Sequence, residues 1–244
     1  MKPHPELNPY YKNIDDKQRF LRKVFDSAAP YYDGIAVWGW FNSGHWYRKD
    51  ALRRAGLTSD MSVLDVASGT GLTAIAIAEL LDNPHKLTCL EPSRGMIQES
   101  VKKLSNLHIQ GTADKISLPD NSFDFLTMGF ALRHVEDLLG AFSEYCRVLK
   151  PGGKLLIMDV TQPKGTISRA LFKAYFKHIL PFFTKLFTGS KEAHYMMVYY
   201  YDTMENMVDP DKVINMLQRA GFTNVRRNTP LGIFSEYTAV KPTP

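Results

Sequence analysis

Short apolar runs alternate with longer amphipathic segments through the middle of this chain, from residue 62 to residue 159. The apolar runs predict buried strands, and segments with apolar residues three or four positions apart predict helices. The predicted strands are 63–66, 86–90, 107–110, 123–128 and 154–159. The two clearest helices between them are 72–81 and 136–148. Alternating strands and helices indicate an α/β fold with a doubly wound parallel sheet.

The flanking segments add helices before and after this core. The pattern predicts helices over 17–29 and 46–55, and a further helix from Asp209 that stops before Gly221. Two last strands follow at 223–227 and 234–240, and Pro181 is expected to break a helix inside the cap. We therefore expect a single domain in four parts: a helical segment (1–60), a core (61–162), a helical cap (163–208) and a C-terminal helix with strands (209–244).

Composition agrees with one globular domain, because 44% of the 244 residues are hydrophobic and 23% are charged. The N-terminus is polar and lacks the apolar region of a secretory signal. No stretch approaches the roughly 20 apolar residues of a membrane span. Two cysteines suggest neither a disulfide framework nor a zinc site, and the sequence shows no metal-binding constellation. These features predict a reduced, cytoplasmic protein.

The net charge of +5 is unevenly distributed. The segment 160–191 has no acidic residue, and its Arg169, Lys173 and Lys177 recur at the spacing of one helix stripe beside a phenylalanine-rich apolar arc. Such a segment suits an anionic membrane surface, so one interpretation is peripheral membrane contact through 164–191. The other is a lid helix with a solvated lysine face, and the two are compatible. Nucleic acid is not expected, because no binding module is recognisable.

The first predicted strand of the core leads into a turn of small residues, Ala67-Ser68-Gly69-Thr70-Gly71. Glycine lets the backbone approach a ligand closely, and the following helix points its N-terminus at the turn. Two ligand classes use such a loop: a dinucleotide and S-adenosylmethionine. Asp65 favours the second, because a carboxylate repels a pyrophosphate but attracts the sulfonium and ammonium groups of S-adenosylmethionine.

Two later acidic residues extend this site. Glu91 ends the second predicted strand, where a carboxylate can accept hydrogen bonds from both ribose hydroxyls. Asp114 follows the third strand and can accept from the adenine amino group, and Met96 can lie against the adenine ring. The order Asp65, Glu91, Asp114 predicts an adenosyl ligand along one edge of the sheet.

Further motifs, spread over nearly the whole chain, resemble the class I S-adenosylmethionine-dependent methyltransferases. The glycine loop and Leu149-Lys150-Pro151-Gly152-Gly153 are shared with that class in general. The segments 25–33, 130–135 and 178–181 resemble more narrowly the ubiquinone/menaquinone-biosynthesis C-methyltransferases. The resemblance implies a Rossmann-like sheet of seven strands with the last one antiparallel. It also implies a donor site built from Tyr32, Asp65, Ala67, Ser68, Gly69, Gly71, Glu91, Pro92, Met96, Ala113, Asp114 and Gly129.

The chain departs from the narrower family where the methyl acceptor is expected. His134 stands where the family usually has Asn, and Asp159 replaces the usual Glu at the end of the fifth strand. The family's Tyr-Arg-Tyr-Leu segment appears here as residues 199–202, and its C-terminal glycine lies within residues 231–234. The sequence therefore supports the donor better than the acceptor.

Methylation of a phenol or quinol ring carbon is helped by a base or a cation near the fourth strand. Arg133 and His134 are the candidates: the imidazole can accept a phenolic proton, and the guanidinium can stabilise a phenolate. The alternative for His134 is a cap on a helix beginning at Val135. Secondary candidates are His45 and Tyr31, whereas His178 and His194 are assigned to the cap. An aromatic wall for the acceptor, or else plain core, is expected from Tyr195, Met196, Met197, Tyr199, Tyr200 and Tyr201.

These observations predict a methyltransferase that uses S-adenosylmethionine to C-methylate a hydrophobic quinol or phenol, with a lipid-like aromatic acceptor as its partner. Three alternatives stay open: N- or O-methylation of a small molecule or phospholipid headgroup, a nicotinamide-dependent oxidoreductase, and a donor-binding protein without catalysis. The expected location is cytoplasmic, with peripheral membrane contact as an addition. The sequence gives no oligomeric state.

Overall fold

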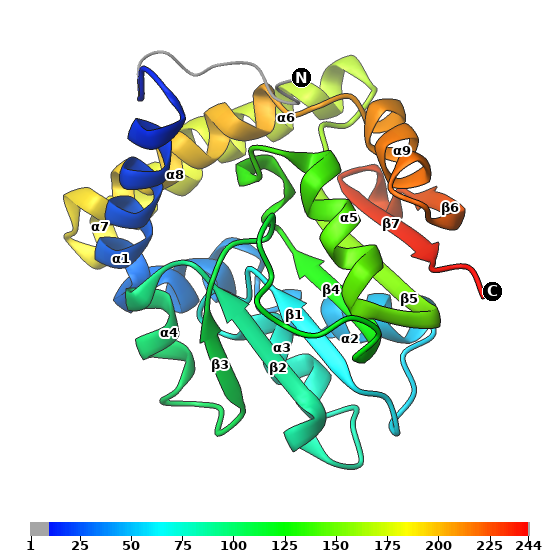
Figure 1. Cartoon of the computed structure of the whole chain (residues 1–244). Helices are drawn as coiled ribbons and strands as arrows, with labels where there is room; N and C mark the ends of the chain where they lie inside the picture. The colour runs from blue at the N-terminus through cyan, green and yellow to red at the C-terminus, as the bar shows by residue number, and fades with distance from the viewer. Residues whose placement is uncertain (1–9, 244) are drawn as a thin grey trace.

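The computed structural model describes residues 10–243 and is built around a seven-stranded sheet in the order β3-β2-β1-β4-β5-β7-β6 (Figure 1). The first five strands pair in parallel, and β7 runs antiparallel to both β5 and β6. The strands are β1 (Val63–Val66), β2 (Leu87–Glu91), β3 (Leu107–Gln110), β4 (Phe123–Gly129), β5 (Leu149–Val160), β6 (Thr223–Asn228) and β7 (Phe234–Val240). The predicted Rossmann-like sheet, including its reversed last strand, is confirmed.

The register of the central strands creates the ligand-binding edge. Val66 of β1 lies level with Leu90 of β2 and with Met128 of β4, so the three strands end side by side. The chain goes from β1 to β2 on one side and reaches β4 on the other. Ligands of open α/β sheets bind at such a reversal, outside the carboxyl ends of the strands.

Helices cover both faces of the sheet. On one face, α5 (Leu138–Val148) and α9 (Pro210–Arg219) share a hydrophobic core with the strands, and on the other α2 (Gly44–Arg54) and α3 (Leu72–Ala78) share a second one. The short α4 (Arg94–Ser100) follows β2. Three short 3₁₀ turns are η1 (Pro84–Lys86), η2 (Leu132–His134) and η4 (Pro230–Gly232).

A third core lies beyond the carboxyl ends of the strands, where Figure 1 shows a layer of long helices across that end of the sheet. The layer consists of α1 (Ile14–Gly39), α6 (Thr166–Ala174), the π-helix η3 (Tyr175–Ile179), α7 (Leu180–Thr188) and α8 (Lys191–Glu205). This layer of helices brings the N-terminal segment and the cap together over the ligand-binding edge.

No helix within residues 10–243 is both long and apolar enough to cross a bilayer.

The prediction that the first helix ends at Ala29 was wrong, because α1 continues through Pro30 to Gly39. A proline inside a helix removes one backbone hydrogen bond and bends the axis. Beyond Pro30, Ile35 is 8% exposed and packs into the third core, between α1 and the cap helices, which we call the cap core. That tertiary packing stabilises the additional turns, which local propensity does not predict.

The expected break at Pro181 was also wrong, because helical structure continues from α6 into α7 through the π-helix. At the junction the N–H of Leu180 donates to the carbonyl of Tyr175, five residues back, as in a π-turn. Pro181 then falls in the first turn of α7, a position at which proline is well tolerated. The wider π-turn accommodates the proline without ending the helical rod.

Other boundaries moved by a few residues. The helix expected from residue 136 begins at Leu138, with Asp137 as its N-cap, whose carboxylate accepts from Gly140 N at 3.1 Å. The fifth strand, predicted over 154–159, already begins at Leu149, so the Pro151-Gly152-Gly153 segment belongs to β5. The β4–β5 pairing shifts its register between Phe123 and Phe125, and this irregularity accommodates the added residues. The helix predicted over 72–81 is shorter and ends at Ala78.

Candidate active site

A cavity of about 170 Å³ lies at the carboxyl ends of β1, β2 and β4, beneath α1. We call it the donor cavity. It is lined by most of the predicted donor residues and by both predicted acceptor residues: Tyr32, Ala67, Gly69, Glu91, Pro92, Met96, Ala113, Asp114, Gly129, Arg133 and His134. Asp65, Ser68 and Gly71 are outside its lining. Segments far apart in the sequence therefore converge on this cavity, including Glu91 and Asp114 of the acidic pattern but not Asp65.

Asp65 is fully buried at the end of β1, next to the glycine loop. Within residues 10–243 neither of its carboxylate oxygens has a hydrogen-bond partner. Burial, and next the negative charge of Glu91, raise the pKa of Asp65, while the charge of Arg48 opposes the shift. A buried carboxylate without a partner is costly for the fold, so this group fits a cationic ligand that supplies hydrogen-bond donors.

Glu91 is also buried, but its carboxylate is already engaged. Its oxygens accept hydrogen bonds from Gly69 N at 2.8 Å and from Ser93 N at 2.9 Å. Burial raises the pKa of Glu91 to about 7, against the lowering effect of these two amides. Because each carboxylate oxygen has two lone pairs, both can still accept from a vicinal diol.

The two predicted loop glycines have different roles. Gly69 lines the donor cavity at φ +57°, and a Cβ there would meet no atom within 4 Å. Gly71 lies at φ +89°, where a Cβ would approach Ser100 Oγ of α4 to 2.6 Å. Gly69 thus borders the ligand, and Gly71 allows the loop to pack against α4.

Helix α1 provides two carboxylates that the sequence interpretation did not include. Asp26 accepts from Ser93 Oγ at 2.6 Å and from Gly95 N at 2.8 Å, at the N-terminus of α4. Asp33 accepts from Thr70 Oγ1 at 2.5 Å, within the glycine loop. Both lie in the 25–33 motif, so the motif itself was the available signal. They fasten α1 over the donor cavity.

The two residues predicted to contact adenine, Met96 and Asp114, come from different elements. Met96 is 2% exposed on α4, and Asp114 is exposed on the loop after β3. Both line the donor cavity. The lining therefore offers one apolar surface and one carboxylate at the end of the cavity that faces α4 and the loop after β3.

Arg133 forms a buried ion pair with Asp159 at 2.5 Å between Nη1 and Oδ1. Its guanidinium also lies 4.0 Å from the ring centroid of Tyr200. Burial raises the pKa of Asp159, and Arg133 opposes the shift. The shorter Asp, noted above as a departure, therefore still holds the arginine beside the cavity.

His134 ends the 3₁₀ turn η2 and is half-buried. Its ring stacks on Tyr199 with centroids 5.8 Å apart and meets Phe25 edge-on at 5.3 Å. The alternative that His134 caps a helix at Val135 was wrong, because α5 begins at Leu138 and is capped by Asp137. The imidazole therefore lies at the cavity wall, supported by aromatic rings from α1 and α8.

The secondary candidates lie elsewhere. His45 bonds Glu79 on the outside of α2, at 3.1 Å, and Tyr31 is 38% exposed on α1. His178 and His194 are in the cap, as assigned, on η3 and α8. The residues of the expected aromatic wall lie on α8, mostly buried against α1, and line neither the donor cavity nor the cleft described next.

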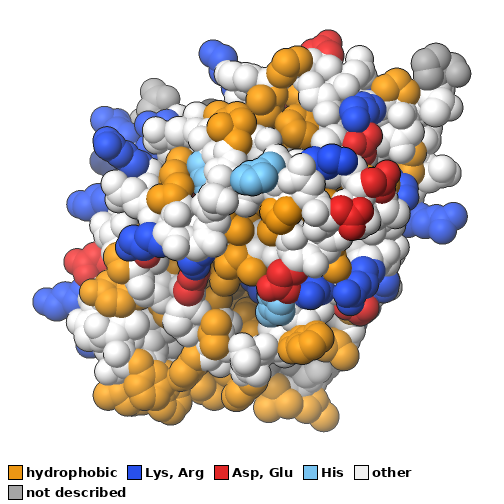
Figure 2. Space-filling model, turned by 90° about the horizontal axis from the view of Figure 1, so that it is seen from below, with side chains coloured by type: hydrophobic (Ala, Val, Ile, Leu, Met, Phe, Trp, Pro, Cys, Tyr) orange, Lys and Arg blue, Asp and Glu red, His pale blue; other side chains and the backbone are white. Residues whose placement is uncertain are grey.

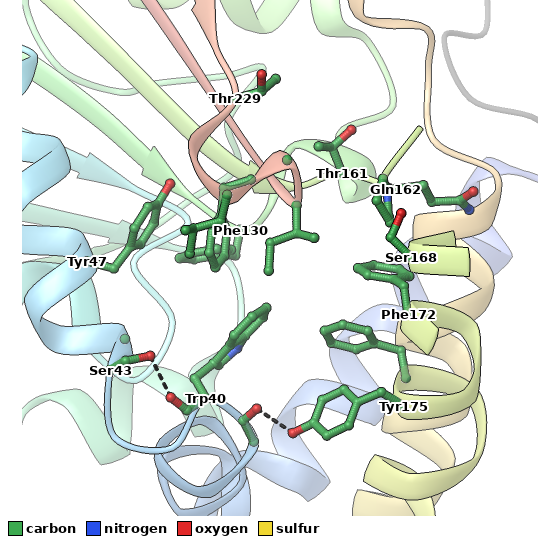
Figure 3. Close-up of a pocket in the computed structure, with 18 of the residues that line it drawn as sticks. Trp40, Ser43, Tyr47, Phe130, Thr161, Gln162, Ser168, Phe172, Tyr175 and Thr229 are labelled. Atoms are coloured by element: carbon green, nitrogen blue, oxygen red, sulfur yellow. Dashed lines mark hydrogen bonds between the residues drawn. The ribbon is translucent and has the colours of Figure 1, made fainter. Parts of the chain in front are cut away.

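A second and larger cavity of about 1120 Å³, which we call the cleft, opens between α2, α6 and the loop before β7 (Figure 3). Figure 3 shows Tyr47 and Phe130 on one side and Phe172 and Tyr175 opposite, with Trp40 at one end. Tyr175 is held by a hydrogen bond of 2.5 Å from its hydroxyl to the Gly39 carbonyl. The walls are mainly aromatic and apolar. Sequence reasoning missed this cleft.

Phe130 belongs to the lining of both cavities. It follows β4 at φ +62°, a strained conformation for a phenylalanine, and its N–H donates to the Met158 carbonyl at 2.7 Å. Ala67, on the donor side, has a similar positive φ of +54°. The donor cavity and the cleft therefore meet at a strained, hydrogen-bonded residue at the end of β4.

Comparison with known proteins places this architecture in a family. The model of the ubiE/COQ5 methyltransferase family matches residues 12–241. A demethylmenaquinone methyltransferase from Anoxybacillus flavithermus is 32% identical over 233 residues, which cover 93% of this chain and 97% of that protein.

Solved structures agree on the fold. A SAM-dependent methyltransferase from Aquifex aeolicus superposes with a TM-score of 0.59 at 21% identity, over 80% of this chain and 89% of that one. Phosphoethanolamine N-methyltransferase 2 from Haemonchus contortus, in complex with S-adenosyl-L-methionine, gives 0.64 at 17% identity, over 91% of this chain and 60% of that one.

Proposed function

This chain belongs to the ubiE/COQ5 methyltransferase family and uses S-adenosylmethionine as its methyl donor, and on that premise we propose that it methylates a ring carbon of a hydrophobic quinol or phenol at a membrane surface. The observation that carries the proposal is the aromatic cleft of about 1120 Å³ that meets the donor cavity at Phe130. Small-molecule sites usually measure about 300–1,000 Å³. The cleft therefore has room for a bicyclic ring with part of an isoprenoid chain.

We assign the donor to the cavity under α1. Asp65 is suited to the ammonium group, Glu91 to the ribose hydroxyls and Asp114 to the adenine amino group. When bound, S-adenosylmethionine supplies a methyl group on a positively charged sulfur, which is an activated carbon. The chain's contribution is to hold the sulfonium and the acceptor carbon in line, which is worth roughly 7–11 kcal/mol in well-oriented reactions.

The acceptor needs electron density on the attacking carbon. Loss of a ring hydroxyl proton gives a phenolate, whose ring carbon forms the new C–C bond while the S–CH₃ electron pair returns to sulfur. The same ring carbon then releases its proton, and the aromatic ring is restored. One base and one stabilising cation are sufficient for this sequence.

His134 and Arg133 are our assignments for these two roles. His134 is a titratable group at the donor-cavity wall, held by contacts with Tyr199 and Phe25. Arg133 is permanently charged and fixed by Asp159, so it contributes a positioned positive charge and does not take up a proton. Variants of Arg133 require a stability control, because loss of its guanidinium leaves the buried Asp159 without its ion-pair partner, at a cost of about 3–5 kcal/mol in folding stability.

Access from a membrane is supported by the rim of the cleft. Four lining residues are large, apolar and exposed by 66–85%: Phe41, Trp46, Leu171 and Leu231. On the adjoining α7, Phe182, Leu186 and Phe187 are exposed by 60–64%, and Phe187 contacts Trp38 near the end of α1. Figure 2 shows exposed hydrophobic side chains gathered along one margin of the molecule, a distribution typical of an interaction surface.

Charges near this apolar rim favour an anionic membrane. Lys164, Arg169, Lys173, Lys177 and Lys185 are all exposed on the cap. The uniform stripe predicted from helix spacing is interrupted, because Lys177 lies in the π-helix, with its ammonium 5.6 Å from the Tyr201 ring. Basic and apolar groups on one segment suit the headgroup boundary of a bilayer.

The test is transfer of a deuterated methyl group. Purified protein is incubated with methyl-deuterated S-adenosylmethionine and vesicles that carry reduced demethylmenaquinone, phosphatidylethanolamine and a soluble catechol, and products are identified by mass spectrometry. We expect label on the quinol ring carbon. Label on the headgroup or on a catechol oxygen instead would reject the proposed acceptor and support the N- or O-methylation alternative.

A cleft-filling variant makes the test specific to the structure. Ser168 is exposed at the cleft wall, so Ser168→Trp is expected to reduce transfer to the quinol at least about tenfold by occupying space the acceptor needs. Ser143 is exposed on α5, and Ser143→Trp is the matched control. Equal activities of the two variants would show that the acceptor does not bind in the cleft.

A further inference from the structure

Arg48 is a buried cation that has no ion-pair partner among residues 10–243. It lies on α2, is 8% exposed and lines the cleft. Within residues 10–243 its guanidinium forms neither a hydrogen bond nor an ion pair, and its Nε is completely buried. A buried charge without a partner is costly, so its presence points to a ligand.

Three other arginines in this part of the molecule, unlike Arg48, have hydrogen-bond or ion-pair partners within the chain. Arg133 pairs with Asp159, Arg54 reaches Glu236 at 2.7 Å, and Arg227 donates to Ser235 at 2.9 Å. Each of these guanidinium groups is neutralised or hydrogen-bonded by its own chain. Arg48 is the exception among the four.

The position of Arg48 suits an anion at the reaction centre. Its guanidinium carbon lies 5.0 Å from the ring centroid of Phe130, the residue shared by the cleft and the donor cavity. Its Nη1 lies close to Gly44, where a Cβ would approach it to 2.8 Å, so a larger residue at 44 would displace it. Its positive charge also acts on Asp65, at the donor side. An anion held by Arg48 would therefore lie beside Phe130, between the two cavities.

We infer that Arg48 binds a negatively charged oxygen of the methyl acceptor, either an ionised ring hydroxyl or a ring carboxylate. The inference rests on the proposed function, because it takes the cleft as the acceptor site. A carboxylate is also present on the donor's amino-acid end, but Arg48 lines the cleft and is not part of the donor-cavity lining. Arginine stays protonated at every physiological pH, so Arg48 adds to the charge of Arg133 a second positive charge that stabilises the phenolate when the ring carbon attacks.

Binding of two naphthalene probes tests this without any methyl transfer. 1-Hydroxy-2-naphthoate is an anion at neutral pH and 1-naphthol is its neutral counterpart. Both are titrated by fluorescence into protein saturated with S-adenosylhomocysteine. The variants are Arg48→Met, Arg48→Lys and the control Arg53→Met, which removes an exposed arginine from the same cleft. Arg48→Met is expected to fold, because no ion pair is broken.

We expect the wild type to prefer the anion. Arg48→Met should bind it about 10- to 100-fold more weakly, as for a lost charge-assisted hydrogen bond, with 1-naphthol and S-adenosylhomocysteine affinities unchanged. Arg48→Lys should retain part of the preference and Arg53→Met all of it. Weaker S-adenosylhomocysteine binding by Arg48→Met would instead assign Arg48 to the donor carboxylate.

The inference also fails if the wild type shows no preference for the anion, or if Arg48→Met keeps it. These outcomes are independent of the proposed function, which is tested by deuterium transfer to the quinol. A protein that prefers the anion through Arg48 but labels no quinol would keep Arg48 as an anion site of the cleft and lose the quinol as the methyl acceptor.

Discussion

Two buried carboxylates are central to the proposed donor site. Asp65 and Glu91 are both buried at the carboxyl ends of adjacent strands, and burial raises the pKa of each. They differ in their partners: Glu91 is bonded by two backbone amides, and Asp65 by no group among residues 10–243. The fold therefore tolerates an unfavourable charge at Asp65 where a cationic ligand can satisfy it, as strained functional sites do.

The first prediction concerns Asp65→Asn, which keeps the shape and removes the charge. Because the buried charge has no partner, we expect the ligand-free variant to unfold at a higher temperature than the wild type, by an amount worth about 1 kcal/mol or more. Affinity for S-adenosylmethionine should fall by about 1.5–3 kcal/mol. Calorimetry of unfolding and of binding measures both. A variant that is less stable, or that binds the donor equally well, would contradict the assignment.

The second prediction is a pH dependence set by Glu91. Its folded pKa of about 7 lies above the ordinary value of 4.5, so the folded protein binds more protons between these limits. The free energy of unfolding should therefore fall as the pH rises through that window. Donor affinity should rise over the same window, because the ionised carboxylate accepts both ribose hydroxyls.

Titrations of S-adenosylhomocysteine from about pH 5.5 to about pH 8 measure the binding side of this prediction. Glu91→Gln is the control, since its amide does not ionise in the range and the curve should flatten. Asp65 shifts in the same direction and stays in both proteins. Identical pH profiles for wild type and Glu91→Gln would assign the dependence to another group.

At the scale of elements, α1 and the glycine loop form one unit beside the donor cavity. Asp26 and Asp33 of α1 bond the start of α4 and Thr70 of the loop, and Gly71 lets the loop rest on α4. A change in any of these contacts is expected to affect the others, because they share the same few residues. The donor cavity is therefore shaped by contacts between elements as well as by residues that touch the ligand.

The third prediction separates backbone strain from packing in this unit. Gly71→Ala should be more destabilising than Gly189→Ala: both glycines have positive φ, but only at Gly71 would the added Cβ meet another atom, Ser100 Oγ at 2.6 Å. We expect about 1 kcal/mol for the strain alone at Gly189 and about 1–3 kcal/mol more at Gly71. Urea unfolding of the ligand-free proteins measures the difference. Equal losses of unfolding free energy in the two variants would mean that α4 moves away from the added Cβ without a measurable cost.

At the scale of the whole molecule, the aromatic cleft, its apolar rim and the basic cap occupy neighbouring surfaces. The apolar arc predicted for 171–180 divides in the structure: Phe172, Phe176 and Leu180 are buried in the cap core, while Leu171 is 66% exposed at the cleft. The same helical rod thus packs on the domain and presents an apolar surface. Both interpretations drawn from its sequence, lid and membrane contact, are physically compatible with this arrangement.

The fourth prediction is the response of vesicle binding to charge. Each lysine near an anionic bilayer contributes about 1 kcal/mol, so Lys173→Glu with Lys185→Glu should weaken sedimentation with phosphatidylglycerol vesicles by at least about tenfold. Added salt should weaken the wild type in the same direction. The control is Lys212→Glu, on α9. Vesicle binding that is unchanged by added salt and by Lys173→Glu with Lys185→Glu would contradict an electrostatic membrane contact.

The sequence by itself predicted the parallel strands of the sheet, because buried strands and glycine turns are local patterns, and the resemblance to class I methyltransferases implied the reversed last strand. The donor residues stay a prediction, drawn from the rule that adjacent parallel strands end at one edge. Tertiary structure alone decided that α1 continues through Pro30 and that η3 carries the chain past Pro181. It also decided that the Asp65 carboxylate and the Arg48 Nε are buried without a hydrogen-bond partner among residues 10–243. It also decided the cleft, whose walls include residues more than a hundred positions apart, such as Trp40 and Phe172. Contacts of that range depend on how helices pack against the sheet, and this packing leaves no periodic signal in the chain.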